Sequence, residues 1–515
     1  MSSSPEKKTW HFLFITSLTL LTFLIQYLFR AVDDNRLTSW KWAFAGRELF
    51  WFFPLILAAV IILYGLLRSP VARQRPVLFL FCCSFALSAL FWSVPEVIID
   101  AARYVTQAKH LELYGTGYFL SQWGGEIVPW TDLPLVPFLY GMIFSLFGEE
   151  RAFVQVLNAC AFSLTTVVTF LIGRALWDEE TGLCAGILLW GIPYLFSQTP
   201  LMLVDVTTMF FLVLSLYSFI MALEKGGGWM PFSGLSVFCA AFAKYSSWMM
   251  LSVLGLIFLV YLLQGDGIRG RVSGGGQGSG IWNPVSAIRK SRRTVLQRGL
   301  FTAFIAGFMI GTVLLLKSDI IAEQVRFLRE YQAPGLRRWG ESFLSTFIFQ
   351  AHPFITAAAL WSVVEATRKK DIRYLIIIWL VLLVVMLQIR RSRYVMVVFP
   401  MVALMAGYGL QALKSQETRR YALSCIVAAS LCVAVFAYRP FLQSMSAVNF
   451  KNAGELLDTL GGDWAEVITV PSPDIPVNLS AAVPILDLFT ARKIIFREGE
   501  GPFPPPEGTE TSPLR

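Results

Sequence analysis

Asp100 and Tyr104 place a carboxylate and a phenol where both could take part in a reaction. They lie four residues apart near the start of a long polar segment, residues 96–151. In a helix this spacing puts a carboxylate and a phenol on one face. The carboxylate could act as a general base that takes a proton from a hydroxyl group. A lone aspartate near a helix start is more often simply stabilised by the helix dipole, so other residues must support this role.

A second group of reactive side chains lies near residue 390. It consists of Arg390, Arg391, Arg393 and Tyr394. A guanidinium group binds phosphate oxygens through paired hydrogen bonds and stays charged at any biological pH. The arginines could therefore hold a lipid phosphate and stabilise it as a leaving group. The alternative is that they reach lipid headgroups or pair with acids of the segment 96–151.

Asp205 lies at the border of an apolar run, where it could help bind a metal ion or orient Lys244. A helix cap would explain its position equally well. His352 is the other weak metal candidate, but Pro353 favours a kinked helix with a satisfied histidine. The seven cysteines lie in apolar stretches without a CxxC pair. The sequence leaves a divalent metal open and predicts no other cofactor.

The composition indicates that membrane helices carry these residues. Of the 515 residues, 56% are hydrophobic and 15% are charged, and the mean hydropathy is +0.60. Such a chain has too much apolar surface for a water-soluble globule. Its apolar residues occur in blocks of roughly 17 to 25, long enough to cross about 30 Å of hydrocarbon. We therefore expect an all-α polytopic membrane protein with about thirteen transmembrane helices.

The expected spans follow the apolar runs. They are 11–31, 49–67, 77–95, 152–175, 182–199, 206–224, 229–243, 247–264, 300–316, 344–365, 374–389, 395–413 and 421–437. The run Leu135–Phe147 is short for a crossing, so we expect a re-entrant or interfacial helix there and exclude it from the count.

These runs divide the chain into three parts. Residues 1–76 hold two extra N-terminal transmembrane helices, and residues 77–438 hold the main transmembrane module. The module includes an outer loop at 96–151 and a Gly- and Ser-rich cytoplasmic linker within 265–299. Residues 439–515 contain helix and strand patterns and a Pro-rich end, which predict a small extracytoplasmic α/β domain with a disordered tail.

Basic residues set the predicted orientation of the chain, whose net charge is +9. They concentrate in short loops between the spans, where positive charge favours the cytoplasmic side. With the N-terminus inside, the acid-rich loop 96–151 lies outside. Asp100 and the arginines at 390–393 then share the outer side, where we expect them to face each other across a cavity open to lipid. This distribution also argues against nucleic acid as a partner.

Several motifs follow Asp100 in a fixed order. They are Tyr104, Ala108, Gly115, Trp123-Gly124-Gly125, Pro134-Leu135-Val136-Pro137, Tyr140-Gly141, Phe147-Gly148, Gly173-Arg174, Asp205, Ala243-Lys244, Arg393-Tyr394 and Pro400. Over residues 91–437 this order resembles the polyprenyl-phosphate-sugar-dependent glycosyltransferases of the GT-C superfamily. The most similar families are the protein O-mannosyltransferases and the lipid A aminoarabinose transferases.

The sequence departs from those families in three places. Asp100-Ala101 replaces their Asp-Glu pair, and Leu133-Pro134-Leu135 replaces their Pro-Pro-Leu. Two extra spans precede the outer loop. Asp33 and Asp34, between those spans, could mimic an acidic pair, although an interfacial turn explains them as well.

The resemblance implies an inverting membrane glycosyltransferase. It implies a donor such as an undecaprenyl- or dolichyl-phosphate-linked sugar and a hydroxyl acceptor on a lipid, glycan or protein. Asp100 would deprotonate the acceptor, and the phosphate would bind Arg390, Arg391 and Arg393. Tyr104, Asp205, Lys244 and Tyr394 would complete the substrate site. We expect the chain among the lipids of a bacterial inner membrane, with its site facing the periplasm.

The alternative is a lipid or glycan transporter or flippase without transferase activity. Such a protein predicts ionisable residues deep in several helices and helices broken near the membrane midplane. In this sequence the candidate residues cluster towards one side of the membrane instead. That distribution favours the transferase.

Overall fold

The structure is a computed structural model that describes residues 5–32, 44, 48–92, 99–129, 132–264, 292–332, 342–444, 446–469, 479–498 and 510–511. Asp33 and Asp34 lie outside these residues, as do the linker before residue 292 and most of the C-terminal tail. The described part of the chain is mostly helical, and it carries the long apolar helices of an integral membrane protein.

Helices of very different lengths make up the bundle. Before residue 265 they are α1 (Pro5–Val32), α2 (Leu49–Arg68), α3 (Pro70–Gln74), α4 (Pro76–Ala89), α5 (Ile99–Gln122), α6 (Leu135–Phe147), α7 (Arg151–Leu176), α8 (Glu179–Leu188), η1 (Leu189–Gly191), α9 (Pro193–Gln198), α10 (Asp205–Lys225), α11 (Trp229–Ala243), α12 (Ser246–Met250) and α13 (Ser252–Gln264). After it they are α14 (Arg292–Leu316), α15 (Ser318–Phe327), η2 (Leu328–Gln332), η3 (Ser345–Gln350), α17 (Pro353–Lys369), α18 (Tyr374–Met386), α19 (Ser392–Val395), η4 (Met396–Val398), α20 (Phe399–Leu410), α21 (Gln416–Val433), η5 (Ala434–Tyr438), α22 (Arg439–Ser444), α23 (Val448–Thr459) and α24 (Leu479–Asp487).

Eight of the expected spans coincide with stretches of helix that are long and apolar enough to cross a membrane, among the described residues. Three more coincide with the shorter apolar helices α4, α11 and α18. A helix of 13 to 15 residues is only about 20 Å long, which is less than the hydrocarbon thickness. The count of thirteen crossings therefore stays a prediction.

The other two expected spans are broken helices. The run 182–199 forms α8, the short turn η1 and α9, and the run 344–365 forms η3 and α17. Each break precedes a proline: Ile192 before Pro193 and His352 before Pro353 both have extended backbone. The proline ring disfavours helical backbone in the residue before it and removes a backbone donor, which explains both breaks.

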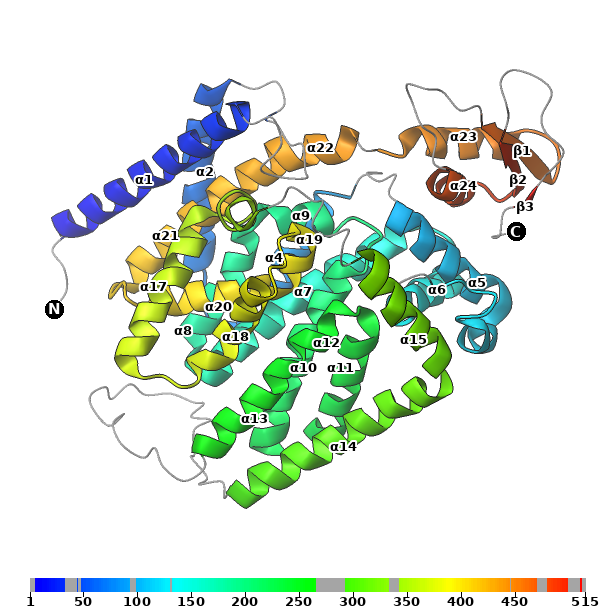
Figure 1. Cartoon of the computed structure of the whole chain (residues 1–515). Coiled ribbons are helices and arrows are strands. Elements are labelled where there is room, and N and C mark those ends of the chain that lie inside the picture. Colours follow the sequence, from blue (N-terminus) through cyan, green and yellow to red (C-terminus); the bar gives the residue numbers. More distant parts are fainter. Residues whose placement is uncertain are drawn as a thin grey trace.

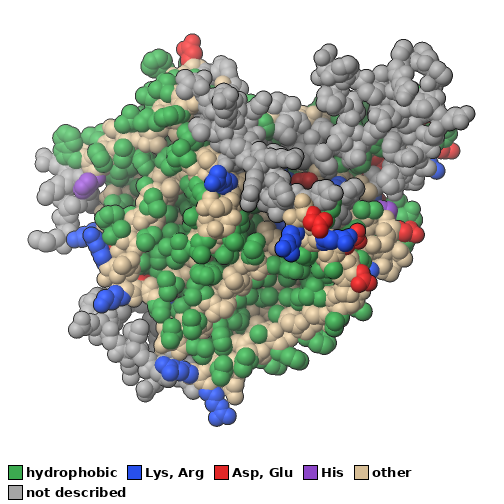
Figure 2. Space-filling model, viewed as in Figure 1, with side chains coloured by type: hydrophobic (Ala, Val, Ile, Leu, Met, Phe, Trp, Pro, Cys, Tyr) green, Lys and Arg blue, Asp and Glu red, His purple; other side chains and the backbone are tan. Residues whose placement is uncertain are grey.

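The centre of the bundle includes α7, α10 and the continuous run from α19 to α20, and the helical stretch that begins with α21 is as buried as α10. Within the apolar stretches of the first three, 72%, 78% and 89% of residues are buried, compared with 17% for α1, α2 and α14. Small residues allow close packing at the centre, since a Cβ at Gly173 would lie 2.6 Å from the Cα of Gly182. The peripheral helices leave apolar side chains exposed, as a lipid-facing surface requires. Figure 2 shows such side chains over most of the visible face.

The two N-terminal helices pack against α21 (Figure 1). Phe12 of α1 stacks on Tyr421 with ring centroids 4.2 Å apart, and Thr16 lies 2.6 Å from the Tyr421 hydroxyl. Tyr64 of α2 donates a 2.5 Å hydrogen bond to Glu417. Aromatic and polar contacts thus join α1 and α2 to the main bundle.

The C-terminal segment contains the expected helix and strands. β1 (Trp464–Thr469) pairs in parallel with β2 (Lys493–Glu498), and β3 (Glu510–Thr511) pairs antiparallel with β2. The helix α24 joins the two parallel strands and packs against α5 (Figure 1). That this segment is a separate domain outside the membrane remains a prediction.

Candidate functional site

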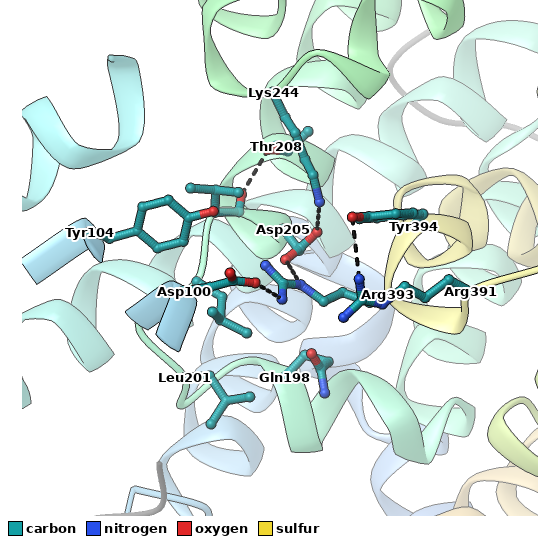
Figure 3. A network of polar contacts seen from close by, with 12 residues as sticks. Asp100, Tyr104, Gln198, Leu201, Asp205, Thr208, Lys244, Arg391, Arg393 and Tyr394 are labelled. Atoms are coloured by element: carbon teal, nitrogen blue, oxygen red, sulfur yellow. Dashed lines mark hydrogen bonds and ion pairs between the residues drawn. The ribbon is translucent and has the colours of Figure 1, made fainter. Parts of the chain in front are cut away.

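Arg393 joins two carboxylates that are far apart in the sequence (Figure 3). Its Nη1 atom donates to Asp100 Oδ2 and its Nε atom donates to Asp205 Oδ2, each over 2.5 Å. Asp100 lies in the first turn of α5, Asp205 begins α10, and Arg393 lies in α19. Three helix beginnings therefore meet at one polar centre. Asp100 and Arg393 are in direct contact, whereas the sequence led us to expect a cavity between them.

Lys244 adds a second cation to Asp205. Its Nζ atom lies 2.5 Å from Asp205 Oδ1 and 4.3 Å from the centre of the Tyr394 ring. It directly follows α11, where the backbone is extended, with φ of −163°. Arg391 also contacts Tyr394, with its Cζ atom 5.1 Å from the ring centre and Nη1 donating to the phenol oxygen over 3.4 Å. Tyr394 thus holds two cations close to Asp205.

Burial separates the roles of the two acids. The Asp205 side chain is 1% exposed and both its oxygens accept from cations, whereas the Asp100 side chain is 29% exposed. Burial alone would raise the pKa of Asp100, but Arg393 and Arg103 outweigh it and hold that pKa below its usual value. Asp100 is therefore an accessible, ionised carboxylate. Asp205 mainly fixes Arg393 and Lys244 in place.

Asp132 belongs to the same network, although the sequence did not single it out. Its Oδ1 accepts a 3.2 Å hydrogen bond from the Tyr104 hydroxyl, and its Oδ2 lies 3.4 Å from Arg103 Nε. Arg103 also donates to Asp100 Oδ1 over 2.9 Å. Burial raises the pKa of Asp132 to about 6, with Arg103 opposing the rise and Asp100 adding to it. Asp132 therefore supplies a second carboxyl group to the network around Asp100, through Arg103 and Tyr104.

Asp132 is fixed from the side of α15. Gln324 donates to the backbone oxygen of Asp132 over 3.0 Å and accepts a hydrogen bond from Tyr245, which follows Lys244. These contacts link the outer loop to α12 and α15. In the sequence Asp132 is only one of several acids in the segment 96–151, and nothing local distinguishes it. Its partners Arg103 and Tyr104 lie on α5 and precede it by 29 and 28 residues.

Other candidates lie apart from this centre. Arg390 is exposed and donates to Gln388 over 3.1 Å. His352 is buried at the start of α17, where Nδ1 accepts a 3.2 Å hydrogen bond from the backbone N–H of Phe354. Among the described residues, no three His, Cys, Asp or Glu side chains are arranged to hold a metal ion. Asp205 is thus paired with two cations, whereas the Nε2 atom of His352 is buried and has no hydrogen-bond partner among the described residues.

Comparisons with known proteins found one matching family model and several similar structures. Residues 129–272 match the family model of dolichyl-phosphate-mannose-protein mannosyltransferases. That match includes Asp132, Asp205 and Lys244. Among curated protein sequences, none matches this chain significantly.

The fold is similar to that of ArnT from Cupriavidus metallidurans. The comparison with ArnT bound to undecaprenyl phosphate gives a TM-score of 0.57 at 12% sequence identity. The matched region covers 83% of this chain and 86% of ArnT. For apo ArnT the TM-score is 0.55 at 12% identity, covering 82% and 86%. At this identity the likeness establishes a common fold. Together with the family match, it confirms the predicted resemblance to GT-C superfamily glycosyltransferases.

Proposed function

We propose that this integral membrane protein transfers a sugar from a polyprenyl-phosphate donor to a hydroxyl acceptor on the extracytoplasmic side. The contact between Asp100 and Arg393 carries the proposal, because it unites a partly exposed acid with a buried guanidinium group. The ArnT fold supports it, since that protein has been solved with undecaprenyl phosphate bound. The sugar donor, the hydroxyl acceptor and the periplasmic orientation are all part of the proposal.

Phosphate binding would use the cations around Asp205 and Tyr394. Arg393, Lys244 and Arg391 are held within one network, and their positive charge suits the two oxygens of a phosphodiester. Asp100 accepts a hydrogen bond from Arg393 Nη1. Binding of the donor would bring a third anion to this guanidinium group, beside Asp100 and Asp205. The cations would then stabilise the charge that develops on the departing phosphate.

The chemical step would be a single displacement. The acceptor oxygen attacks C1 of the sugar while the bond from C1 to the phosphate oxygen breaks, and polyprenyl phosphate leaves with the electron pair. The acceptor proton passes to Asp100. Attack from the side opposite the phosphate inverts the configuration at C1. Because the pKa of Asp100 is low, this carboxylate is a weak base, and its placement beside the acceptor must provide much of the rate.

Asp132 would take the part of the second acid in the Asp-Glu pair of the related families. It holds Arg103 and Tyr104, both on the helix that carries Asp100. A metal would have to compete with Arg393 and Lys244 for Asp205, the strongest acidic candidate. We therefore assign no step to a metal ion.

The deciding experiment is a transfer assay with purified protein. The protein would be incubated with a radiolabelled undecaprenyl-phosphate sugar and a mixture of acceptor lipids from the cell envelope. The proposal expects labelled acceptor, or labelled free sugar from slow hydrolysis, together with release of undecaprenyl phosphate. Movement of the intact donor across a proteoliposome membrane without cleavage would instead establish the flippase alternative.

A further inference from the structure

A cavity of about 300 Å³ lies at the end of the bundle opposite the candidate site. The helix α7 shows the separation. Arg151 at its start lies 3.4 Å from the backbone oxygen of Pro200, close to the site, and its last residue, Leu176, is two residues before Asp178, the cap of α8. A helix of 26 residues is about 39 Å long. The cavity therefore belongs to the other membrane surface, which the positive-inside rule assigns to the cytoplasm.

Three arginines line the cavity: Arg73, Arg419 and Arg420. Arg419 is neutralised, because its Nη2 atom lies 2.7 Å from Glu180 Oε1. Arg420 is only 8% exposed, and its buried Nη1 atom has no hydrogen-bond partner among the described residues. The Glu417 Oε1 atom lies 3.8 Å from that nitrogen, too far for a hydrogen bond. A buried guanidinium donor without a partner is costly, so an acceptor from outside the chain would be favourable.

The polar side of the cavity favours an anion. The α8 and α21 helices both begin here, but Asp178, Glu179 and Glu180 at the start of α8 and Glu417 on α21 offset the partial positive charge of these helix beginnings, so the preference for an anion depends on the arginines. Glu179 and Glu180 also line the cavity, but Glu180 is paired with Arg419, and Glu179 is exposed at its edge. Arg420 has the Glu417 carboxylate 3.8 Å away, but its buried Nη1 atom still lacks a hydrogen bond among the described residues, and Arg73 lines the cavity as an exposed cation.

Apart from Gln416, the remaining lining is apolar. It includes Leu67, Leu183, Ile187 and Leu423, three of which are at most 3% exposed. A soluble phosphate would gain nothing from this surface. A lipid would place its phosphate on the arginines and its first methylene groups against the leucines and the isoleucine. We propose that this cavity binds the headgroup phosphate of a membrane phospholipid, at a site separate from the sugar-transfer centre.

The test measures the thermal unfolding midpoint of the full-length protein in detergent with three additives. These are dioleoyl-phosphatidylglycerol, dioleoylglycerol, which has the chains without the phosphate, and glycerol phosphate, which has the phosphate without the chains. We expect only the complete lipid to raise the midpoint. In Arg73→Gln, the lipid concentration for half of this shift should rise about five- to tenfold. Leu183→Trp, which fills the apolar part of the cavity, should show little or no shift.

Arg75→Gln is the matched control, because it removes the same charge from the same loop and Arg75 does not line the cavity. It should respond to the lipid like the unmodified protein. An equal weakening in Arg73→Gln and Arg75→Gln would mean a general charge effect and would overturn the proposal. An equal shift with glycerol phosphate would overturn the lipid as ligand, and an equal shift with dioleoylglycerol would overturn the role of the phosphate.

Discussion

Lys109 and Asp487 form an ion pair that fastens the C-terminal segment to the helix carrying Asp100. The Lys109 Nζ atom lies 2.5 Å from Asp487 Oδ2 and 2.6 Å from Glu149 Oε1, and the lysine is 1% exposed. Lys109 follows Asp100 by nine residues on α5, which places it about 13 Å further along the helix. The segment that ends the chain therefore helps to position the start of the candidate site.

Replacing this lysine should weaken the fold. Lys109→Met removes the cation from the buried Asp487 and the partly buried Glu149, and we expect a loss of roughly 3 to 5 kcal/mol in the free energy of unfolding. Denaturant unfolding would measure the loss, and limited proteolysis would show release of the segment after residue 446. Adding Asp487→Leu should recover much of the stability, because the buried charge is then removed. An unchanged unfolding midpoint in Lys109→Met would contradict this account of the ion pair.

Asp100→Asn should abolish transfer while the protein folds normally. The amide keeps the shape of the side chain but cannot accept the acceptor proton, and a general base contributes roughly 100- to 10,000-fold to the rate. The measurement is the transfer rate of protein purified in normal yield. Glu126→Gln is the control, since Glu126 is an acid of the same segment whose partner is the exposed contact with Tyr118. A fully active Asp100→Asn enzyme would remove Asp100 from the mechanism.

The arginines near residue 390 should differ sharply in their effects. Arg393→Lys keeps the charge, but one ammonium group cannot reproduce the two directed bonds to Asp100 and Asp205. We expect a fall of roughly 100- to 1000-fold in kcat/KM. Arg390→Lys should change it little, because Arg390 is exposed and contacts only its neighbour Gln388 among the described residues. Equal losses in both variants would mean that the contacts of Arg393 with Asp100 and Asp205 have no special role in the reaction.

Glu149 should make stability depend on pH. Burial raises its pKa to about 7, although Lys109 acts in the opposite direction. The unfolded chain has a glutamate pKa of about 4.3, so the folded protein binds this proton more tightly. The contribution of Glu149 to the free energy of unfolding is thus fully present below about pH 4.3 and is lost as pH rises through about 7. Unfolding measured from pH 4 to pH 8 should show this fall, and Glu149→Gln should flatten it.

The sequence predicted the helices well wherever an apolar run was uninterrupted. Trp229–Ala243 and Leu135–Phe147 were expected with the bounds that the structure has. The prediction was less accurate where a proline lies inside a run. Pro193 and Pro353 interrupt two expected spans, because run length measures hydrophobicity and not the ability of the backbone to continue a helix.

The candidate site was only partly visible in the sequence. The types of Asp100, Asp205 and Arg393 suggested their chemistry, and the structure brings these residues together. Their neighbour Asp132 was not recognised, because its partners Arg103 and Tyr104 are set by the packing of α5 against the loop that follows it. Arg393 is buried because it lies inside α19, which begins at Ser392, whereas Arg390 precedes that helix and is exposed. The sequence alone does not distinguish them, because three of the four residues 390–393 are arginine.

Asp132 should give the transfer reaction a pH dependence on the acid side. Because burial raises its pKa to about 6, the carboxyl group gains a proton below that pH and Arg103 loses an anionic partner. The Arg103 guanidinium group would then interact more strongly with Asp100 and make this proposed base weaker. We therefore expect kcat/KM to fall as pH drops below about 6. Asp132→Asn should have a low kcat/KM at pH 8 and no further step near pH 6. If the unmodified protein and Asp132→Asn had the same pH profile, Asp132 could not be the group that titrates.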